Sequence, residues 1–165
     1  MAGAWRALPI LACAIACSPI KDYTEAARAL TFQLQRVEPR LHMALPLERS
    51  QVGFRVTLGV TNPSPVPFHV LGFTGQLRLE AGGAQRPIGR IELAQPLELP
   101  AGGQGRLEAD LAFTYQDLKD NWPALVAAMC GAPGRWHLEG TLRATAYGFP
   151  VQLPVRTSRG QGDAP

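Results

Sequence analysis

The stretch QVGFRVTLGVT, residues 51–61, decides the fold of this chain, because apolar residues occupy every second position along it. A period of two residues is that of a β-strand, whose successive side chains point to opposite faces. Such a strand buries one face in a core and leaves the other in water. The predicted inward face carries Phe54, Val56, Leu58 and Val60, and the outward face carries Arg55, Thr57 and Thr61.

The same alternation recurs along most of the chain on both sides of this strand. Residues 106–115 (RLEADLAFTY) place one set of apolar side chains on a single face: Leu107, Ala109, Leu111, Phe113 and Tyr115. Further strands are predicted within residues 32–45, 68–83, 88–93, 136–148 and 149–157. Pro154 places the last of these strands at a sheet edge, because proline cannot donate to a ladder.

One segment breaks the strand pattern and is predicted to be a helix near residues 121–130. Asp120 or Asn121 can cap its N-terminus, Pro123 suits its first turn, and the helix is expected to end at Gly131. Its apolar stripe is predicted to pack on the core rather than to form a binding groove. The stripe consists of Trp122, Leu125, Val126 and Met129.

Seven or so short strands separated by turns, with one short helix, predict an all-β fold. The predicted architecture is an antiparallel β-sandwich, in which each sheet has one apolar and one polar face. Hydrophobic residues make up 46% of the chain and charged residues 18%, which is a globular composition. The net charge of +3 is too small and too dispersed to indicate nucleic-acid binding.

The N-terminus has the layout of a bacterial secretion signal. Arg6 precedes the apolar run LPILACAIAC at residues 8–17, and small residues lead into Cys17. The run is too short for a transmembrane helix. It looks like a lipoprotein signal in which Cys17 becomes the acylated N-terminus, although Ala14 stands where such signals usually have Leu. An ordinary cleaved secretory signal and a buried N-terminal helix are the alternatives.

These observations divide the chain into four parts. We expect a lipoprotein-type signal peptide over residues 1–16, a tether over 17–32, a β-sandwich domain over 33–158 and a disordered tail over 159–165. Part of the tether, from Thr24 to Leu30, is expected to form one or two helical turns with Thr24 as their cap. A lipid anchor on Cys17 would place the protein in the bacterial cell envelope, at the periplasmic side of the outer membrane rather than at the inner membrane.

The residues that usually carry chemistry are scattered along the chain. The three histidines, His42, His69 and His137, fall on separate predicted strands without metal-ligand spacing, and we expect them at the surface or rim. Neither a G-x-S-x-G motif nor a phosphate-binding glycine loop occurs. Cys130 is predicted to be a small buried hydrophobe. A solvated sheet face is expected to hold the acidic residues Glu80, Glu92, Glu98, Glu108, Asp110 and Glu139. We therefore expect no catalytic residue, no cofactor and no metal site, and a protein that is not an enzyme.

Asn62 and Pro63 directly follow the strand of residues 51–61. An Asn side chain can bond to the backbone nearby, and proline fixes φ, so the pair suits a turn. The sequence therefore predicts a structural role for both residues rather than ligand binding.

Several short motifs in a fixed order resemble the late embryogenesis abundant type 2 family, whose unit is also called the water-stress and hypersensitive-response (WHy) domain. They are the Asn62–Pro63 pair, LPAGGQG at 99–105, YQDL at 115–118 and GFPVQLPV at 148–155. The resemblance covers roughly residues 33–160. It implies a sandwich of immunoglobulin-like or fibronectin type III-like shape, a link to desiccation and stress tolerance, an envelope lipoprotein in bacteria, and no catalytic residues.

Three functions stay open at this point. The first is a non-enzymatic envelope lipoprotein with a protective or structural role in desiccation or other stress. The second is a binder or carrier of an apolar ligand such as a lipid, in a slot between the sheets lined by Gly59, Ala109, Gly140 and Ala144. The third is an assembly partner that pairs an edge strand with another envelope protein. The expected partners are thus the membrane, an apolar ligand or an envelope protein, and not nucleic acid.

Overall fold

The structure, a computed structural model, describes residues 19–160, and its first sheet is built around β2 (Gln51–Thr61). This strand lies between β1 (Thr31–His42) and β6 (Gln104–Thr114) and is antiparallel to both. The four side chains of β2 that were predicted to face inward are at most 3% exposed. The predicted strand and the assignment of its two faces are confirmed.

The second sheet follows the rest of the chain. It contains β3 (Phe68–Ala81), β4 (Ala84–Leu93), β5 (Leu97–Leu99), β7 (Arg135–Ala146) and β8 (Phe149–Gly160). Its order is β4-β3-β7-β8, and β5 pairs with the first residues of β3. The strand that contains Pro154 is an edge strand, as predicted, because an inner strand would need the N–H that proline lacks.

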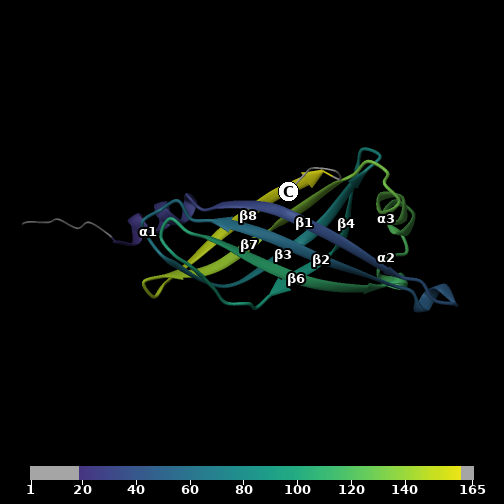
Figure 1. Cartoon of the computed structure of the whole chain (residues 1–165), viewed down its shortest axis with the longest axis horizontal. Coiled ribbons are helices and arrows are strands. Elements are labelled where there is room, and N and C mark those ends of the chain that lie inside the picture. The colour runs from purple at the N-terminus through teal and green to yellow at the C-terminus, as the bar shows by residue number, and fades with distance from the viewer. Residues whose placement is uncertain (1–18, 161–165) are drawn as a thin grey trace, which may run out of the picture.

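The two sheets stack face to face, and their inner side chains form one core (Figure 1). Phe54 of β2 and Trp136 of β7 meet edge to face across the layers, with ring centroids 5.5 Å apart. Aromatic rings favour this arrangement because the edge of one ring is positive and the face of the other is negative. Every strand pairing in the described residues is antiparallel, so the predicted antiparallel β-sandwich is confirmed.

Two short helices connect the two sheets after β6. The helix predicted near residues 121–130 is α3 (Trp122–Met129), with Asn121 as its N-cap residue and Gly131 just beyond its end. A preceding turn, α2 (Tyr115–Leu118), was not predicted. A capping box forms it, because the hydroxyl of Thr114 accepts from the N–H of Asp117 while the Asp117 carboxylate accepts from Thr114.

The N-terminal helix α1 (Pro19–Arg28) begins earlier than the turn predicted from Thr24. Thr24 therefore lies inside the helix instead of at its cap. Ala27 and Leu30 are buried against the core beside β8, which explains why the helix is part of the folded unit. At the other end of the domain, β8 continues to Gly160, two residues past the predicted boundary at 158.

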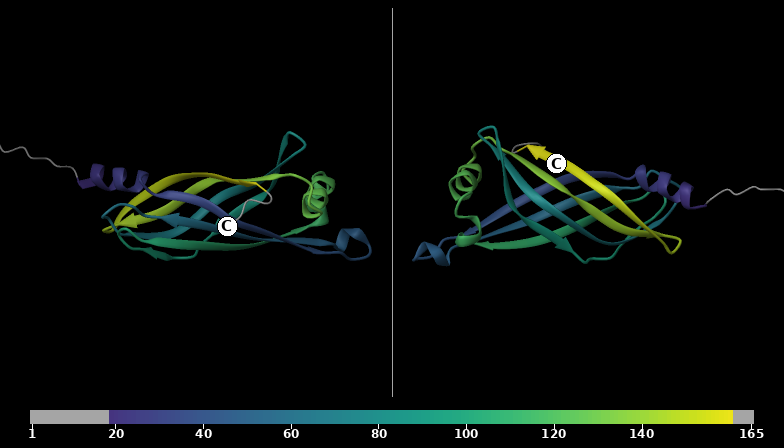
Figure 2. Two further views of the ribbon diagram at one scale, coloured as in Figure 1. Left: turned by 45° about the horizontal axis from the view of Figure 1, so that its top comes forward. Right: turned by 180° about the vertical axis from the view of Figure 1, so that it is seen from behind.

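The molecule is elongated and has two distinct ends (Figures 1 and 2). One end carries α1 and the turn between β7 and β8. The opposite end carries α3 and the loop between β1 and β2, which contains a short 3₁₀ helix, η1 (Leu47–Arg49). No helix in residues 19–160 has both the length and the apolar character needed to cross a membrane.

Candidate functional site

A groove of about 560 Å³ lies on the outer face of the three-stranded sheet. Its residues come from β1, β2 and β6, with one residue of β8 at the edge of β1. We call it the polar groove and define it by Gln33, Gln35, Arg36, Glu38, Arg55, Thr57, Arg106, Glu108 and Arg159. The strand register places unlike side chains next to one another, since Thr57 on the central strand has Arg36 on one side and Glu108 on the other.

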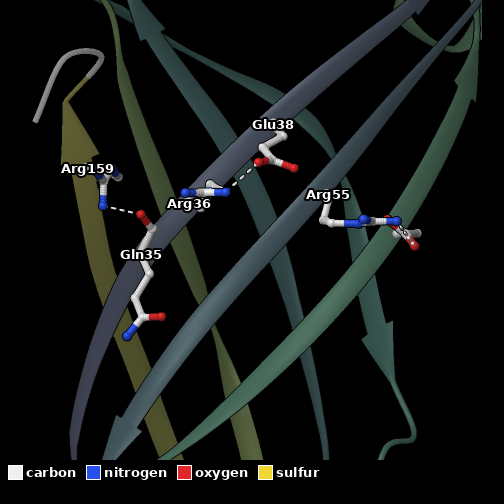
Figure 3. A network of polar contacts seen from close by, with 6 residues as sticks. Gln35, Arg36, Glu38, Arg55 and Arg159 are labelled. Atoms are coloured by element: carbon white, nitrogen blue, oxygen red, sulfur yellow. Dashed lines mark hydrogen bonds and ion pairs between the residues drawn. The ribbon is translucent and has the colours of Figure 1, made fainter. Parts of the chain in front are cut away.

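A β-bulge in β1 creates one wall of the polar groove. The register of β1 against β2 shifts between Leu34 and Arg36, which leaves Gln35 without a partner in the ladder. The side chain of Gln35 lies across Gly59, so a side chain at position 59 would collide with Gln35. The Oε1 of Gln35 accepts a hydrogen bond from Arg106 Nε at 3.2 Å. The backbone carbonyl of Gln35 accepts a hydrogen bond from Arg159 of β8 (Figure 3).

These contacts also join the two sheets along one side of the sandwich. The N–H of Leu34 donates to Thr157 Oγ1 at 3.1 Å, so β1 is bound to β8 by side chains rather than by a ladder. Arg159 belongs to the part of the chain that was predicted to be a disordered tail. The structure places it in β8, opposite Trp136 of β7.

Ion pairs neutralise much of the charge in and beside the polar groove. Arg55 makes a two-point contact with Asp110 of β6, with Nε–Oδ1 at 2.8 Å and Nη2–Oδ2 at 3.0 Å. This hydrogen-bonded pair raises the pKa of the Arg55 guanidinium and holds the pKa of the Asp110 carboxyl below its ordinary value. Arg36 likewise donates to Glu38 at 2.8 Å (Figure 3).

The chemistry available in the polar groove is limited to charge and hydrogen bonding. Its four arginines outnumber its two glutamates, so it presents a small excess of positive charge. None of its nine residues is Ser, Cys, His or Lys, and its one hydroxyl, on Thr57, is buried. The polar groove can hold water or a small anion, but it lacks an activated nucleophile.

The sequence predicted the general character of this face but not the groove. Glu108 and Asp110 lie exposed on it, where a solvated face was predicted. Gln35, Arg106 and Arg159 were not singled out. The one available signal was Gly59 in the middle of a strand, since a strand glycine often marks a close approach by another group.

Asn62 lies outside the polar groove, in the loop from β2 to β3, and is fully buried. Its Nδ2 donates to the carbonyl oxygens of Val66 and Pro100 at 2.8 and 2.9 Å. Its Oδ1 accepts from the N–H and the hydroxyl of Ser64 at 3.1 and 2.7 Å. These bonds connect the loop to the turn before β6 and use all the polar atoms of the side chain. Pro63 beside it is exposed.

The three histidines lie on three different strands, and two of them contact glutamates. His69 Nδ1 lies 2.5 Å from Glu98 Oε1, and His137 Nε2 lies 2.7 Å from Glu80 Oε2. His42 is exposed at the end of β1. No group of three or more His, Cys, Asp or Glu in residues 19–160 is placed to hold a metal ion.

The prediction that Cys130 is buried is wrong, because its side chain is exposed. Cys130 is the C-cap of α3, whose buried residues are Leu125 and Ala128. An α-helix turns about 100° per residue, so a position two residues after Ala128 points away from the core.

The small residues that were predicted to line a slot between the sheets do not leave one at their positions. A Cβ on Gly140 would lie 2.6 Å from Cζ of Phe73, and one on Gly75 would lie 2.5 Å from it. The buried ring of Phe73 therefore occupies the space beside both glycines. Gly59 faces outward under Gln35, whereas Ala109 and Ala144 are buried in the packed core. Cys17 and the predicted signal peptide lie outside the described residues.

Comparisons with protein families and with known proteins show which family this chain belongs to. The LEA type 2 family model, described as late embryogenesis abundant protein, matches residues 57–159. A comparison with curated proteins finds no match.

Solved structures resemble the chain at low sequence identity. A protein from Archaeoglobus fulgidus is 13% identical with a TM-score of 0.46, covering 78% of this chain and 95% of that one. A protein from Arabidopsis thaliana, solved in solution, is 19% identical with a TM-score of 0.49, covering 75% and 76%. A solution structure assigned to the late embryogenesis abundant (LEA) proteins is 16% identical with a TM-score of 0.45, covering 87% and 83%. Since the family model spans more than half of its residues, the chain belongs to the late embryogenesis abundant type 2 family.

Proposed function

We propose that this chain is a non-enzymatic lipoprotein of the bacterial cell envelope with a protective or structural role in desiccation or other stress. Its family membership supports the stress-related role, and the apolar run that ends at Cys17 supports the anchor. The observation that carries the proposal is the family match over residues 57–159, and the ring of Phe73 beside Gly75 and Gly140 argues against a ligand slot at that place between the sheets. The domain then acts through its surface, held at the membrane by its N-terminus.

The polar groove supports a non-enzymatic role. Arg36, Arg55, Arg106 and Arg159 each bind an acceptor within the chain. Arg36 and Arg55 bind carboxylates, whereas Arg106 and Arg159 bind neutral oxygens of Gln35, and all of these contacts except that of Arg36 join different strands. The location that we propose is the outer membrane, with the domain on the periplasmic side.

The experiment that tests this proposal uses Cys17→Ser in the cells that make the protein. We expect mass spectrometry to find acyl groups on the wild-type N-terminus, and the variant to leave the membrane fraction and to lower survival after drying. Cys130→Ser is the matched control, because it makes the same chemical change at an exposed position of the domain. A Cys17→Ser chain that keeps its membrane association, its mass and its effect on survival would contradict the proposal.

Binding of an apolar ligand is a second candidate, and one observation favours it. A recess of about 590 Å³ lies between α1 and β8. Phe32 and Pro154 are the more exposed of its apolar lining residues, and Arg28 and Arg156 are exposed at its walls. An acyl chain with an anionic head group fits this combination. The site differs from the slot predicted between the sheets.

Titration of a fluorescent fatty acid tests the second candidate. Saturable one-to-one binding that is lost in Arg28→Glu would make this chain a lipid binder and overturn the first proposal. Arg143→Glu is the control, because Arg143 is exposed on β7 outside the recess. No binding by the wild-type chain would rule the second candidate out.

A further inference from the structure

Three aromatic side chains gather at the end of the molecule that carries α1. Tyr147 lies in the turn between β7 and β8 and Phe149 directly follows that turn, and they are 64% and 44% exposed. Tyr23 of α1 contacts both, with ring centroids 5.5 Å from Tyr147 and 5.6 Å from Phe149. We call these three residues the aromatic tip. Tyr147 and Phe149 are exposed, whereas Tyr23 is partly buried against the core.

The backbone of this turn gives no reason for an aromatic residue at its centre. Ala146 pairs with Phe149, so the turn has two central residues, Tyr147 and Gly148, with φ of 49° and 83°. Two-residue turns with positive φ at both positions favour Asn, Asp or Gly, because a side chain is strained there. Tyr147 is also mostly in water, so burial does not compensate for the strain. A bulky residue held in such a position points to a function outside the fold.

The sequence places the predicted anchor next to the aromatic tip. The first described residue, Pro19, begins α1, and Cys17 precedes it by two residues. Two residues of extended chain span at most about 7 Å. An acyl chain on Cys17 therefore enters the membrane at the same end of the elongated domain as α1 and the β7–β8 turn (Figure 2).

We propose that the aromatic tip binds the headgroup region of the bilayer into which Cys17 is anchored, an inference that rests on the proposed lipidation. Tyr rings favour this region because their apolar bodies enter the acyl boundary while their hydroxyl groups stay hydrated. The anchor keeps the tip at high effective concentration near the lipid, so a weak contact is enough. In this orientation the long axis of the sandwich points away from the membrane surface, so the loop between β1 and β2 lies far from the lipid.

Two fluorescent labels on the purified acylated protein, reconstituted in phosphatidylethanolamine–phosphatidylglycerol vesicles, test this orientation. One label is placed on Pro150→Cys in a Cys130→Ser background, because Pro150 is exposed beside the tip. The other is placed on the natural Cys130, the exposed C-cap residue of α3, and α3 lies at the opposite end of the molecule from α1 (Figure 1). We expect a nitroxide on the lipid headgroup to quench the first label several-fold more than the second.

The decisive comparison uses the variant Tyr147→Asn/Phe149→Thr, because the anchor alone already brings this end near the lipid. Asn is favoured at positive φ, so the turn is retained. We expect quenching at residue 150 to fall toward that at Cys130, while mass spectrometry still finds the acyl groups. Met43→Ser/Leu45→Ser, which removes exposed apolar residues at the other end, is the matched control and should change nothing.

Each of the other outcomes also decides the question. Unchanged quenching in the tip variant overturns the inference, and so does a dimer in detergent that only the tip variant abolishes, since the tip would then bind a second copy. If the protein carries no acyl group, the proposed function is wrong, and the unacylated chain is added to the same vesicles. If the unacylated wild-type chain binds these vesicles and the unacylated tip variant does not, lipid binding by the aromatic tip is supported. Equal vesicle binding by the two chains overturns the inference.

Discussion

The inner and outer faces of the three-stranded sheet are made by the same strands but are stabilised by different interactions. On the inner face, the β2 side chains from Phe54 to Val60 are almost completely removed from water. On the outer face, Arg55 binds Asp110, yet the Asp110 side chain is 69% exposed. Burial of apolar surface contributes to the free energy of folding in proportion to its area, whereas exposed ion pairs contribute little.

This difference predicts how substitutions on each face affect the stability of the domain. The inner face is constrained by close packing, so a substitution there alters the stability of the whole domain. The outer face is a set of replaceable polar contacts, so its substitutions alter charge and local geometry. We therefore expect the effects of mutations to decrease from the core to the polar groove.

The largest expected effect is that of Leu58→Ala on the inner face. Leu58 is 2% exposed, and removing its side chain leaves a cavity that costs about 2–5 kcal/mol of unfolding free energy. Leu111, predicted from the sequence to face the core as well, is only half-buried, so Leu111→Ala should cost less. Urea denaturation measures both values. An equal loss at the two positions would contradict the difference in burial.

The next effect is that of Asn62→Ala, which removes a buried polar side chain from the loop between β2 and β3. The change removes the two bonds that Asn62 donates to the carbonyls of Val66 and Pro100, and it removes the acceptor of the buried Ser64 N–H, which costs about 1–3 kcal/mol. Asn121→Ala is the control, because Asn121 also donates to a carbonyl, that of Pro87 at 2.7 Å, but does so at the surface. If Asn62→Ala lowers the unfolding free energy less than Asn121→Ala does, the buried hydrogen bonds of Asn62 do not stabilise the domain more than a surface bond does.

The sequence predicts the inner face of the sheet well because burial of one face imposes a period of two residues. Phe54 and Leu58 are placed correctly for this reason, and Pro154 is placed correctly at a sheet edge because proline cannot donate to a ladder. The polar groove could not be predicted, because it depends on a one-residue register shift at Gln35, and nothing in the alternation marks a bulge. Cys130 shows the same limit, since the face of a short helix is fixed by what packs against it.

A third effect tests the contact between Gln35 and Gly59 in the polar groove. Gly59→Ala places a Cβ against the side chain of Gln35, which is long and flexible and can move away, so we expect a loss of about 1 kcal/mol. Gln35→Ala removes the obstacle. The double variant should therefore be more stable than the sum of the two single losses predicts, as thermal unfolding can measure. Strict additivity would mean that the two residues do not touch.

The smallest expected effect is the pH dependence contributed by the Arg55–Asp110 pair. The hydrogen bonds from Arg55 hold the pKa of the Asp110 carboxyl below its ordinary value of about 3.9. A depressed pKa in the folded state adds stability at neutral pH, and this stability is lost as the pH falls through the folded-state pKa.

Wild type and Asp110→Asn should therefore differ slightly at pH 7 and converge in acid, below about pH 4. Asp117→Asn is a matched control for the carboxyl itself, because its pKa is lowered by Thr114 in a capping box and not by an arginine. Salt should reduce the difference at pH 7 for Asp110→Asn more than for Asp117→Asn, since an exposed ion pair is screened by counterions. An equal salt dependence in both variants would show that hydrogen bonding, and not the charge of Arg55, supports the outer face.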